Sequence, residues 1–451
     1  MTTQRKTALT LLTLDAASTI GVFNLVSYYR LAPHHFIFSP LFAPAALLLF
    51  GIYLIDGYES RTNMQSLDYT SLHIIAVISA TLATLLLTFA FVPAGYELQS
   101  SRGVIALSFV ALIPVTLTYR HLIYQRIAHL RAGRSLLFFG DPVSCEAFEA
   151  ECRKMGVTQP IMYTSLEKTE KSGNRPARAF AERILGIRNG QYSVEAIVLR
   201  ESSRDLPLDA AQQLMDLHFG GVPTYTLELF HQVYWQKIPL YRINPTWLFQ
   251  EGFQIAREPV FERLKRASDI ALAAVGLLLA TPVLLIAGLA IWAEDRGPVF
   301  FRQNRIGRNR ARFRLVKLRT MRTGPDTGSM YTQPGDRRIT RVGRFLRSTR
   351  IDEMPQLWNV FRGDMSLIGP RAEWDRLVAE YEQQIPCYSF RHLVKPGITG
   401  WAQVNYPYGA SVEDTLRKLE YDLYYIRHFS FLLDASIVLK TVQIMLFGKG
   451  R

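Results

Sequence analysis

Four long apolar runs near the start of the chain constrain its fold more than any other feature. They cover residues 9–29, 41–58, 72–92 and 104–124. Each run is close to the ~20 residues that an α-helix needs to cross the hydrocarbon core of a bilayer. Asp15 is the one acidic residue well inside a run, whereas a channel or transporter would need more polar groups within the membrane. The sequence therefore predicts four anchoring transmembrane helices within residues 1–130.

Basic residues at both ends of this region orient the predicted anchor. Arg5 and Lys6 precede the first run, and four arginines end or follow the fourth, namely Arg120, Arg126, Arg131 and Arg134. Lys and Arg are enriched on the cytoplasmic side of membrane helices, so both ends belong there, in agreement with an even number of spans. No small-residue cleavage site follows the first run, so we expect a retained anchor and not a removed signal.

Overall charge and composition also fit a membrane protein. The 451 residues carry a formal charge of +14 and are 49% hydrophobic. This combination favours anionic lipid or an anionic substrate as partner, and it argues against a soluble nucleic-acid binder. The cysteines, Cys145, Cys152 and Cys387, form no Cys-x-x-Cys pair and indicate neither a disulfide framework nor a zinc site.

Residues 131–250 have the pattern of a small α/β domain. Residues 135–140 and 195–199 are typical of buried parallel strands, residues 209–219 of a helix and residues 222–227 of another strand. Alternating strands and helices predict a Rossmann-like fold. Its first turn, starting at Gly140, lacks the G-x-G-x-x-G pattern, so we expect a regulatory or oligomerisation module that does not bind a dinucleotide.

A fifth apolar run, residues 270–292, has basic residues on both sides. An ordinary crossing would carry the basic last third of the chain across the membrane, against the charge rule. Thr281-Pro282 stands in its middle, and a proline there removes a backbone hydrogen bond and breaks a helix. We therefore predict a helix–break–helix segment near residues 267–293 that enters one leaflet and returns; a proline-kinked span is the alternative. Residues 431–447 are apolar but carry two charges, which favours an interfacial or docked helix.

Residues 348–371 carry the strongest chemical signal. Ser348 or Thr349 is expected to cap a helix whose first turn holds Asp352 and Glu353, with Pro355 just behind them. An apolar helix face follows, made of Met354, Leu357, Trp358 and Phe361. The helix dipole favours ionised acids at this position.

Five arginines surround the two acids in sequence: Arg344, Arg347, Arg350, Arg362 and Arg371. An ionised carboxylate among cations suits nucleophilic attack, or metal binding beside a phosphate. The alternative is an ordinary acidic first turn that only stabilises its helix.

Three further segments add basic or turn-rich character. Residues 303–321 alternate basic and apolar side chains, as in a half-buried strand whose cationic face could hold phosphates. They lack the interleaved aromatic residues of a nucleic-acid platform. Residues 363–371 and 395–405 are turn-rich loops, and a turn arginine can fork onto a phosphate. Together these segments predict a basic, loop-built site behind the carboxylate pair.

From about Phe261 to its end the chain resembles the bacterial sugar transferase family, the monotopic polyprenyl-phosphate phosphoglycosyl transferases. Six ordered motifs carry the resemblance, at residues 265–269, 317–321, 336–344, 352–360, 363–371 and 395–401. Four preceding spans and a degenerate Rossmann-like module are similar to the long form of that family. The resemblance thus implies a membrane α plus α/β protein: a four-helix transmembrane anchor, a degenerate Rossmann-like domain, and a mainly α catalytic domain over residues 251–451 with a re-entrant membrane helix.

The resemblance also implies a reaction. Asp352 would attack the β-phosphate of a UDP-sugar, with glucose or galactose as the expected sugar, and release UMP. Undecaprenyl phosphate would then take the phosphosugar, and Mg2+ would lie near Asp352 and Glu353. The other implied site residues are Lys317, Arg319, Pro370 and Arg371 for the substrate, Lys265, Arg266 and Asp269 for the lipid phosphate, and Thr281 and Pro282 for the helix break.

Two positions depart from the family pattern. Ala372 stands where a second proline is common, which predicts a less rigid loop, and Thr281 stands where serine is common. Threonine keeps a hydroxyl that can bond a freed backbone carbonyl, so we expect the hairpin to survive.

The resemblance places the protein in the bacterial inner membrane with its catalytic domain on the cytoplasmic side. A homodimer is one alternative for its oligomeric state. A membrane regulator or assembly scaffold that binds nucleotide sugars would show a damaged acidic pair, and Asp352-Glu353 is intact. A polytopic enzyme of similar chemistry would need more spans.

Overall fold

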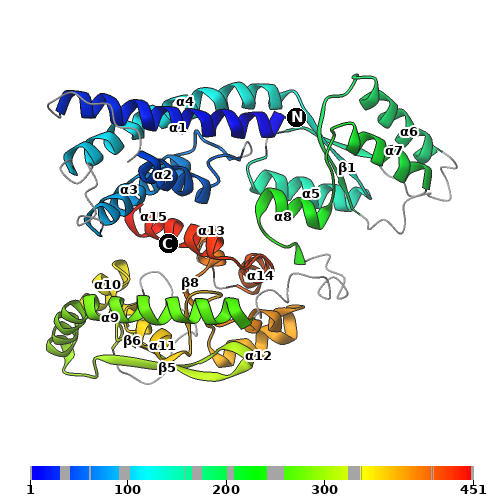
Figure 1. The fold of residues 1–451 in the computed structure, drawn as a ribbon. Coiled ribbons are helices and arrows are strands. Elements are labelled where there is room, and N and C mark those ends of the chain that lie inside the picture. The colour runs from blue at the N-terminus through cyan, green and yellow to red at the C-terminus, as the bar shows by residue number, and fades with distance from the viewer. Residues whose placement is uncertain are drawn as a thin grey trace. The chain divides into compact units, whose positions relative to one another are not determined.

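The computed structural model describes residues 3–30, 41–59, 62–90, 102–157, 159–164, 175–200, 208–240, 259–322, 336, 338–407, 409 and 411–447. The chain divides into two compact units, Met1–Gln236 and Lys237–Arg451 (Figure 1). The first combines membrane helices with a parallel sheet, and the second is mainly α-helical. Each unit is described by itself.

Four apolar helices open the first unit, as predicted: α1 (Thr3–Arg30), α2 (Phe42–Leu54), α3 (Leu67–Ala90) and α4 (Arg102–Ala132). By length and composition α1, α3 and α4 can cross a membrane, whereas α2 has only 13 residues. The predicted second run to residue 58 was thus too long. The helix ends because Asp56 adopts a left-handed φ of 56° and a side chain at Gly57 would collide with Ile52.

The acid inside the first run is fully buried and paired. Arg120 of α4 donates to both Asp15 oxygens, at 2.7 and 2.6 Å, and the Tyr58 hydroxyl donates to the same carboxylate at 2.7 Å. Arg120 is itself fully buried, so it does not belong to the basic flank to which the sequence assigned it. A neutralised ion pair joins α1 to α4, which fits an anchoring bundle.

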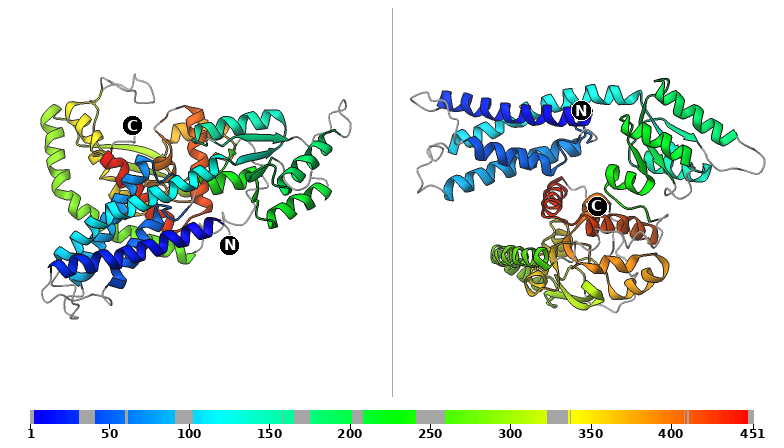
Figure 2. Two further views of the ribbon diagram at one scale, coloured as in Figure 1. Left: turned by 90° about the horizontal axis from the view of Figure 1, so that it is seen from above. Right: turned by 45° about the vertical axis from the view of Figure 1, so that its right-hand side comes forward.

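A four-stranded parallel sheet completes the first unit. Its order is β2-β1-β3-β4, with β1 (Ser135–Phe139), β2 (Ile161–Thr164), β3 (Val194–Leu199) and β4 (Thr224–Thr226). Helices α6 (Arg175–Arg188) and α7 (Leu208–Phe219) share one core with the sheet, and α5 (Pro142–Lys154) and α8 (Leu227–Trp235) share the other. The sheet is therefore covered on both faces, as Figure 2 shows. Strands β1, β3 and β4 were predicted; β2 was not.

The second unit begins with α9 (Pro259–Asp295) and a hairpin of antiparallel strands, β5 (Phe300–Ile306) and β6 (Arg312–Leu318). The predicted cationic strand is therefore two strands joined by the 3-10 helix η7 (Arg308–Arg310). The remaining elements are α10 (Arg341–Ser348), the 3-10 helix η8 (Ile351–Glu353), α11 (Gln356–Arg362), β7 (Ser366–Ile368), α12 (Asp375–Gln384), the 3-10 helix η9 (Tyr388–Leu393), β8 (Gly397–Thr399), α13 (Trp401–Asn405), α14 (Val412–Arg427) and α15 (Phe431–Phe447).

The main core of this unit lies between α12, η9, α14 and α15, around Tyr388, Leu419 and Ile437. Helix α15 is docked on it, because Asp434 accepts a hydrogen bond from the Tyr425 hydroxyl at 2.8 Å and pairs with Lys265. This agrees with the expected docked helix.

Helix α9 runs without interruption through Thr281 and Pro282, so the predicted break is wrong as stated. The helix instead changes direction about its middle, as Figures 1 and 2 show. Pro282 has no N–H for the carbonyl four residues earlier, and proline in a helix interior produces such bends. The Thr281 hydroxyl donates to the Leu277 carbonyl at 2.7 Å, the kind of bond expected of it.

The packing of α9 requires the bend. Ala273 shares a core cluster with Leu315 of β6, and Ala287 and Ile291 share another with Leu318. Leu315 and Leu318 are ~10 Å apart along a strand. A straight helix would separate residues 273 and 291 by ~27 Å. Both halves of α9 therefore fold back onto one short strand.

Candidate active site

The Asp352-Glu353 pair lies on the 3-10 helix η8, between α10 and α11. The prediction that Ser348 or Thr349 caps a helix start is wrong: the two residues end α10, where both hydroxyls donate to the Phe345 carbonyl. The chain turns immediately afterwards, because Arg350 adopts a left-handed φ of 60°. The acids therefore occupy a tight turn between two short helices.

Asn359 fixes α11, and with it the acidic turn, to strand β6. Its Oδ1 accepts from the Val316 N–H at 3.0 Å, and its Nδ2 donates to the Arg314 carbonyl at 2.9 Å. The side chain is 2% exposed, so these bonds are shielded from water. This connection sets the spacing between the acids and Lys317, which follows Val316 on the same strand.

Glu353 is surrounded by cations. Lys317 Nζ donates to Glu353 Oε1 at 2.9 Å, and Arg371 Nη2 lies 3.5 Å from the same oxygen. Arg350 Nη1 lies 3.9 Å from Oε2. Burial by itself raises the pKa of Glu353, but Lys317 and Arg371 outweigh it and hold that pKa at about 2. Glu353 therefore stays ionised and paired with cations, most closely through Oε1.

Asp352 has the opposite environment. It is 8% exposed, and among the described residues its carboxylate has no hydrogen-bond or ion-pair partner. Burial and the neighbouring Glu353 charge raise the pKa of Asp352, and Lys317, Arg347 and Arg350 only partly oppose this. A buried carboxylate without a partner is basic and available to react with a ligand.

Asp352 and Glu353 are also candidate ligands for a magnesium ion. Within the described ranges no group of three or more His, Cys, Asp or Glu residues could hold a metal ion. Mg2+ commonly uses one or two carboxylates together with substrate phosphates. The Asp352 carboxylate, without a protein donor, fits that role beside a diphosphate, and Glu353 could supply a second oxygen.

Comparison with known proteins identifies the family to which the C-terminal unit is similar. Residues 260–448 match the description "Bacterial sugar transferase". A relative from Caulobacter vibrioides named UDP-glucose:undecaprenyl-phosphate glucose-1-phosphate transferase is 46% identical over 187 residues, which are 40% of this chain and 69% of its own. The chain belongs to the bacterial sugar transferase family.

Two further members of the family share shorter parts of their own length with this chain. UDP-N-acetylgalactosamine-undecaprenyl-phosphate N-acetylgalactosaminephosphotransferase from Aeromonas hydrophila is 37% identical over 262 residues, 58% of this chain and 61% of its own. UDP-glucose:undecaprenyl-phosphate glucose-1-phosphate transferase from Escherichia coli is 45% identical over 185 residues, 40% of this chain and 39% of its own.

Among the predicted substrate residues of this family member, Lys317 and Arg371 meet the acidic pair and Arg319 does not. Arg319 donates to the Pro298 carbonyl and forms a bidentate pair with Asp295, so it closes the end of α9. Pro370 precedes Arg371, and its carbonyl accepts the Gly397 N–H at 2.9 Å.

The predicted lipid-phosphate residues lie together on the first half of α9 and contact neighbouring elements. Lys265 pairs with Asp434. Arg266 Nη2 donates to the Phe361 carbonyl at 2.7 Å, at the end of α11. Asp269 accepts from the Leu367 N–H at 3.0 Å. These contacts join α9 to α15, α11 and β7, and binding of lipid phosphate by the three side chains stays a prediction.

Two aromatic side chains of α11 remain exposed beside the acids. Trp358 is 52% and Phe361 39% exposed, and their rings stack with centroids 5.9 Å apart. Leu357, on the same apolar face, instead packs against Gly276 of α9. An exposed aromatic pair on a helix that packs against α9, which is apolar enough to enter a membrane, suits an interface with lipid.

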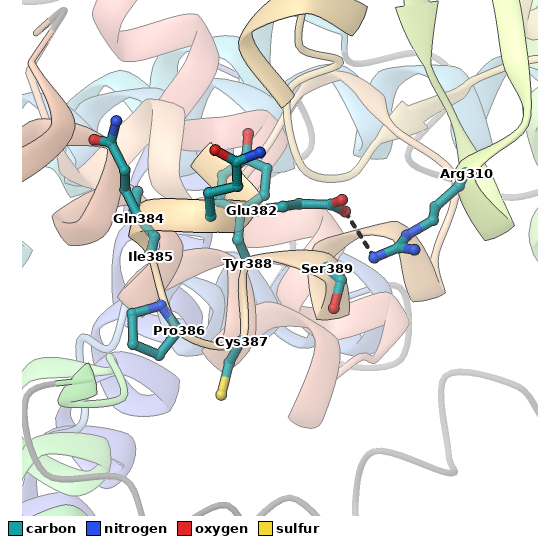
Figure 3. A pocket seen from close by; sticks show the side chains of 9 residues that line it. Arg310, Glu382, Gln384, Ile385, Pro386, Cys387, Tyr388 and Ser389 are labelled. Carbon is teal, nitrogen blue, oxygen red and sulfur yellow. Dashed lines mark ion pairs between the residues drawn. The ribbon is translucent and has the colours of Figure 1, made fainter. Parts of the chain in front are cut away.

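Two cavities of this unit differ in whether residues that pair with Glu353 line them. A narrow cavity of about 10 Å³, room for about one water, touches Lys317, Gln356 and Arg371. A larger cavity of about 220 Å³ lies at the end of α12, where Arg310 pairs with Glu382 at 3.0 Å (Figure 3). None of its lining residues belongs to the acidic pair or contacts it, so its size does not make it the active site.

Sequence reasoning missed several residues that shape this site, namely Asn359, Arg305, Arg391 and Asp422. The signal in the sequence that could have found two of them is a polar residue among apolar neighbours. Asn359 stands between two apolar residues of α11, and Arg391 stands within a run of large aromatic and apolar side chains. A polar side chain at a buried position usually forms a hydrogen bond with another part of the protein, so such residues indicate a structural contact.

Proposed function

We propose that this protein transfers a sugar-1-phosphate from a UDP-sugar to undecaprenyl phosphate and releases UMP. One observation supports it most: Glu353 is neutralised by Lys317 and Arg371, while the adjacent buried Asp352 has a raised pKa and no partner among the described residues. A carboxylate can act as a covalent nucleophile, and its reactivity rises with basicity once it is ionised.

In the proposed first step, an Asp352 oxygen attacks the β-phosphorus of the UDP-sugar. The bond from that phosphorus to the bridging oxygen breaks, and UMP leaves with the electron pair. The phosphosugar stays on Asp352 as an acyl phosphate. Arg371 and Lys317, both within 3.5 Å of Glu353, are positioned to face the charge that develops on the diphosphate.

In the second step, a phosphate oxygen of undecaprenyl phosphate attacks the phosphorus of this acyl phosphate. The bond to Asp352 breaks, and the products are a lipid-diphosphate sugar and the free carboxylate. A magnesium ion held by Asp352 and Glu353 with the diphosphate oxygens would supply charge neutralisation. Two steps allow the soluble and the membrane substrate to use the same carboxylate in turn.

The sugar is proposed from the relatives' names, with galactose added from the family resemblance. Glucose stands in several of them, and N-acetylgalactosamine in the one whose alignment of 262 residues is longer than the C-terminal unit. UDP-glucose, UDP-galactose and UDP-N-acetylgalactosamine are therefore the first donors to test. The product would start a repeat unit of an exopolysaccharide, O-antigen or capsule, and one relative named for exopolysaccharide production supports this.

We further propose that α9 is a re-entrant membrane helix, with the catalytic unit on the cytoplasmic face of the inner membrane. The bend of α9 and the return of its second half to β6 support this. Single cysteines at Glu262 and Glu294 should both react with a membrane-impermeant thiol reagent from the cytoplasmic side only. Reaction of the two from opposite sides would make α9 an ordinary span. The Rossmann-like sheet is proposed as an accessory module, and a homodimer as an arrangement to test.

The deciding experiment measures UMP release in detergent with magnesium, undecaprenyl phosphate and each UDP-sugar. Wild type should release UMP from one sugar, and Asp352→Asn should abolish it. Mass spectrometry of the enzyme incubated without undecaprenyl phosphate should find a phosphosugar on the peptide that contains Asp352. Persistent activity in Asp352→Asn would reject that residue as nucleophile. Binding of UDP-sugars without turnover would favour a scaffold.

A further inference from the structure

Three consecutive carbonyl groups beside the acidic pair, those of residues 370–372, are each held by a different part of the C-terminal unit. Their donors, in that order, are the Gly397 N–H at 2.9 Å, Arg391 Nη2 at 3.0 Å and Arg305 Nη1 at 3.0 Å. Hydrogen bonds from charged donors are about twice as strong as those between neutral groups. The segment that carries Arg371 is therefore firmly fixed, although Ala372 replaces the proline that commonly stiffens it.

Arg391 is the central donor of this set, and it is deeply buried. Its Nη1 donates to the Tyr388 hydroxyl at 2.6 Å, and its Nη2 donates to Asp422 Oδ2 at 2.9 Å. Arg391 is 6% exposed, Tyr388 1% and Asp422 2%. A buried guanidinium needs such a counter-charge, and a planar fork with several fixed donors has one orientation here.

The guanidinium of Arg391 touches the main chain of Arg371 and, through it, the position of its side chain. The Arg371 guanidinium lies 3.5 Å from Glu353 Oε1, with its side chain 35% exposed. Among the described residues Arg391 forms no hydrogen bond or ion pair with Asp352 or Glu353; its partners are Tyr388, Asp422 and the Arg371 carbonyl. Its effect on the acidic pair must therefore pass through Arg371.

We infer that Arg391 is a positioning residue: by holding the Arg371 carbonyl it keeps the Arg371 guanidinium at Glu353, where the diphosphate of the donor would bind. This inference rests on the proposed function. A displacement of about 1 Å in such a group costs on the order of 100-fold in rate. Lysine at position 391 keeps the charge opposite Asp422, but its single nitrogen cannot occupy the positions of both Nη1 and Nη2, from which Arg391 reaches its three partners.

A double-mutant cycle tests the inference in the full-length protein. Rates of UMP release are measured for wild type, Arg391→Lys, Arg371→Ala and the double variant. Arg391→Lys should lower kcat/KM for the UDP-sugar at least about tenfold in wild type. It should change activity less than about twofold once Arg371 is absent, because nothing remains to be positioned. Arg417→Lys is the matched control, since Arg417 lies on the same helix as Asp422 and forms its ion pairs with Glu413 and Glu420.

A second variant and a binding measurement cover the cases in which Arg391→Lys does not fold or Arg371→Ala is too slow to assay. Tyr388→Phe removes a single bond to Arg391 and should give a smaller, few-fold loss with the same dependence on Arg371; it replaces Arg391→Lys if that variant does not fold. If Arg371→Ala is too slow to assay, the affinity for the UDP-sugar is measured by calorimetry in an Asp352→Asn background. Equal losses with and without Arg371, or no loss in wild type, would overturn the inference. An inactive wild type would instead reject the proposed function.

Discussion

Replacing Lys317 by methionine tests the electrostatic asymmetry of the acidic pair most directly. Lys317 Nζ lies 2.9 Å from Glu353 Oε1, closer than any other cation that is paired with Glu353 among the described residues. The pKa of Glu353 is held at about 2, against an ordinary 4.5. That difference corresponds to about 3 kcal/mol in favour of the charged form, although burial alone would disfavour it. Removing Lys317 removes the largest of the opposing contributions.

The sign of the expected change follows from this lowered pKa. An acid whose folded-state pKa is lowered keeps its ionised form at all pH values above its ordinary pKa, and loses it only as the pH falls toward 2. Without Lys317 two close carboxylates compete for one proton, and the pair titrates at higher pH. We expect the acid limb of the pH–rate profile to move upward by about one pH unit, so the rate below that limb falls about tenfold.

The measurement is kcat for UMP release between pH 4.5 and 9 with both substrates saturating. Lys317→Arg keeps the positive charge and should leave the acid limb within about 0.3 pH units of wild type. Arg350→Met removes a more exposed cation at 3.9 Å and should move the limb much less than Lys317→Met. An acid limb that stays in place in folded Lys317→Met, or moves to lower pH, would refute this account of the acidic pair.

Three further substitutions test the structure around the site. Asn359→Ala leaves the Val316 N–H without its partner and should cost about 2 kcal/mol, measured as a lower thermal midpoint together with reduced UMP release. Trp358→Ser should raise KM for undecaprenyl phosphate several-fold and leave KM for the UDP-sugar unchanged; equal changes in both would separate this side chain from the lipid. Gly343→Ala places a Cβ 2.1 Å from the Thr320 carbonyl oxygen and should destabilise the protein by about 1–3 kcal/mol in thermal unfolding, whereas Gly133→Ala, with open space around it, should not.

The membrane helices and strands β1, β3 and β4 could be predicted because their signals are local, whereas β7 and β8 lie in segments that were predicted, wrongly, as loops alone. A run of about 20 apolar residues or a short buried strand pattern needs no knowledge of its neighbours. The end of α2 depended on finer information, a left-handed Asp56 followed by a glycine that avoids Ile52. Strand β2 was missed because only Thr164 of its four residues is buried, so its pattern is weak.

The sequence correctly predicted that Pro282 disturbs the helix at that position, but it wrongly predicted that the helix would break there. Pro282 removes one hydrogen bond, which is enough to bend a helix but not to end it when both halves have something to pack against. Here Ala273 and Ile291 both reach β6, and Thr281 bonds a nearby carbonyl. That tertiary support is invisible in a single sequence.

The partners of the acidic pair were only partly predictable. Lys317 and Arg371 came from the motif resemblance, and the structure brings both to Glu353. Arg319 belongs to the same motif as Lys317, yet it turns to Asp295 at the end of α9. Lys317 and Arg319 are two residues apart on one segment, yet they pair with different acids. The reason is that the bend of α9 places Asp295 beside Arg319. Spacing along the chain cannot predict such a choice.

The turn that carries the acids accounts for their division of roles. Side chains that follow one another in a 3-10 helix point about 120° apart, so adjacent acids need not share an environment. Glu353 faces strand β6 and the segment of Arg371, and the cations on both make it a fixed anion. Asp352 has no hydrogen-bond or ion-pair partner among the described residues, and burial together with the Glu353 charge raises its pKa. A first α-helical turn with solvated acids would give two similar carboxylates. The combination of a left-handed Arg350, a tight turn and an α11 fixed by Asn359 gives one carboxylate held by cations and one carboxylate with a raised pKa.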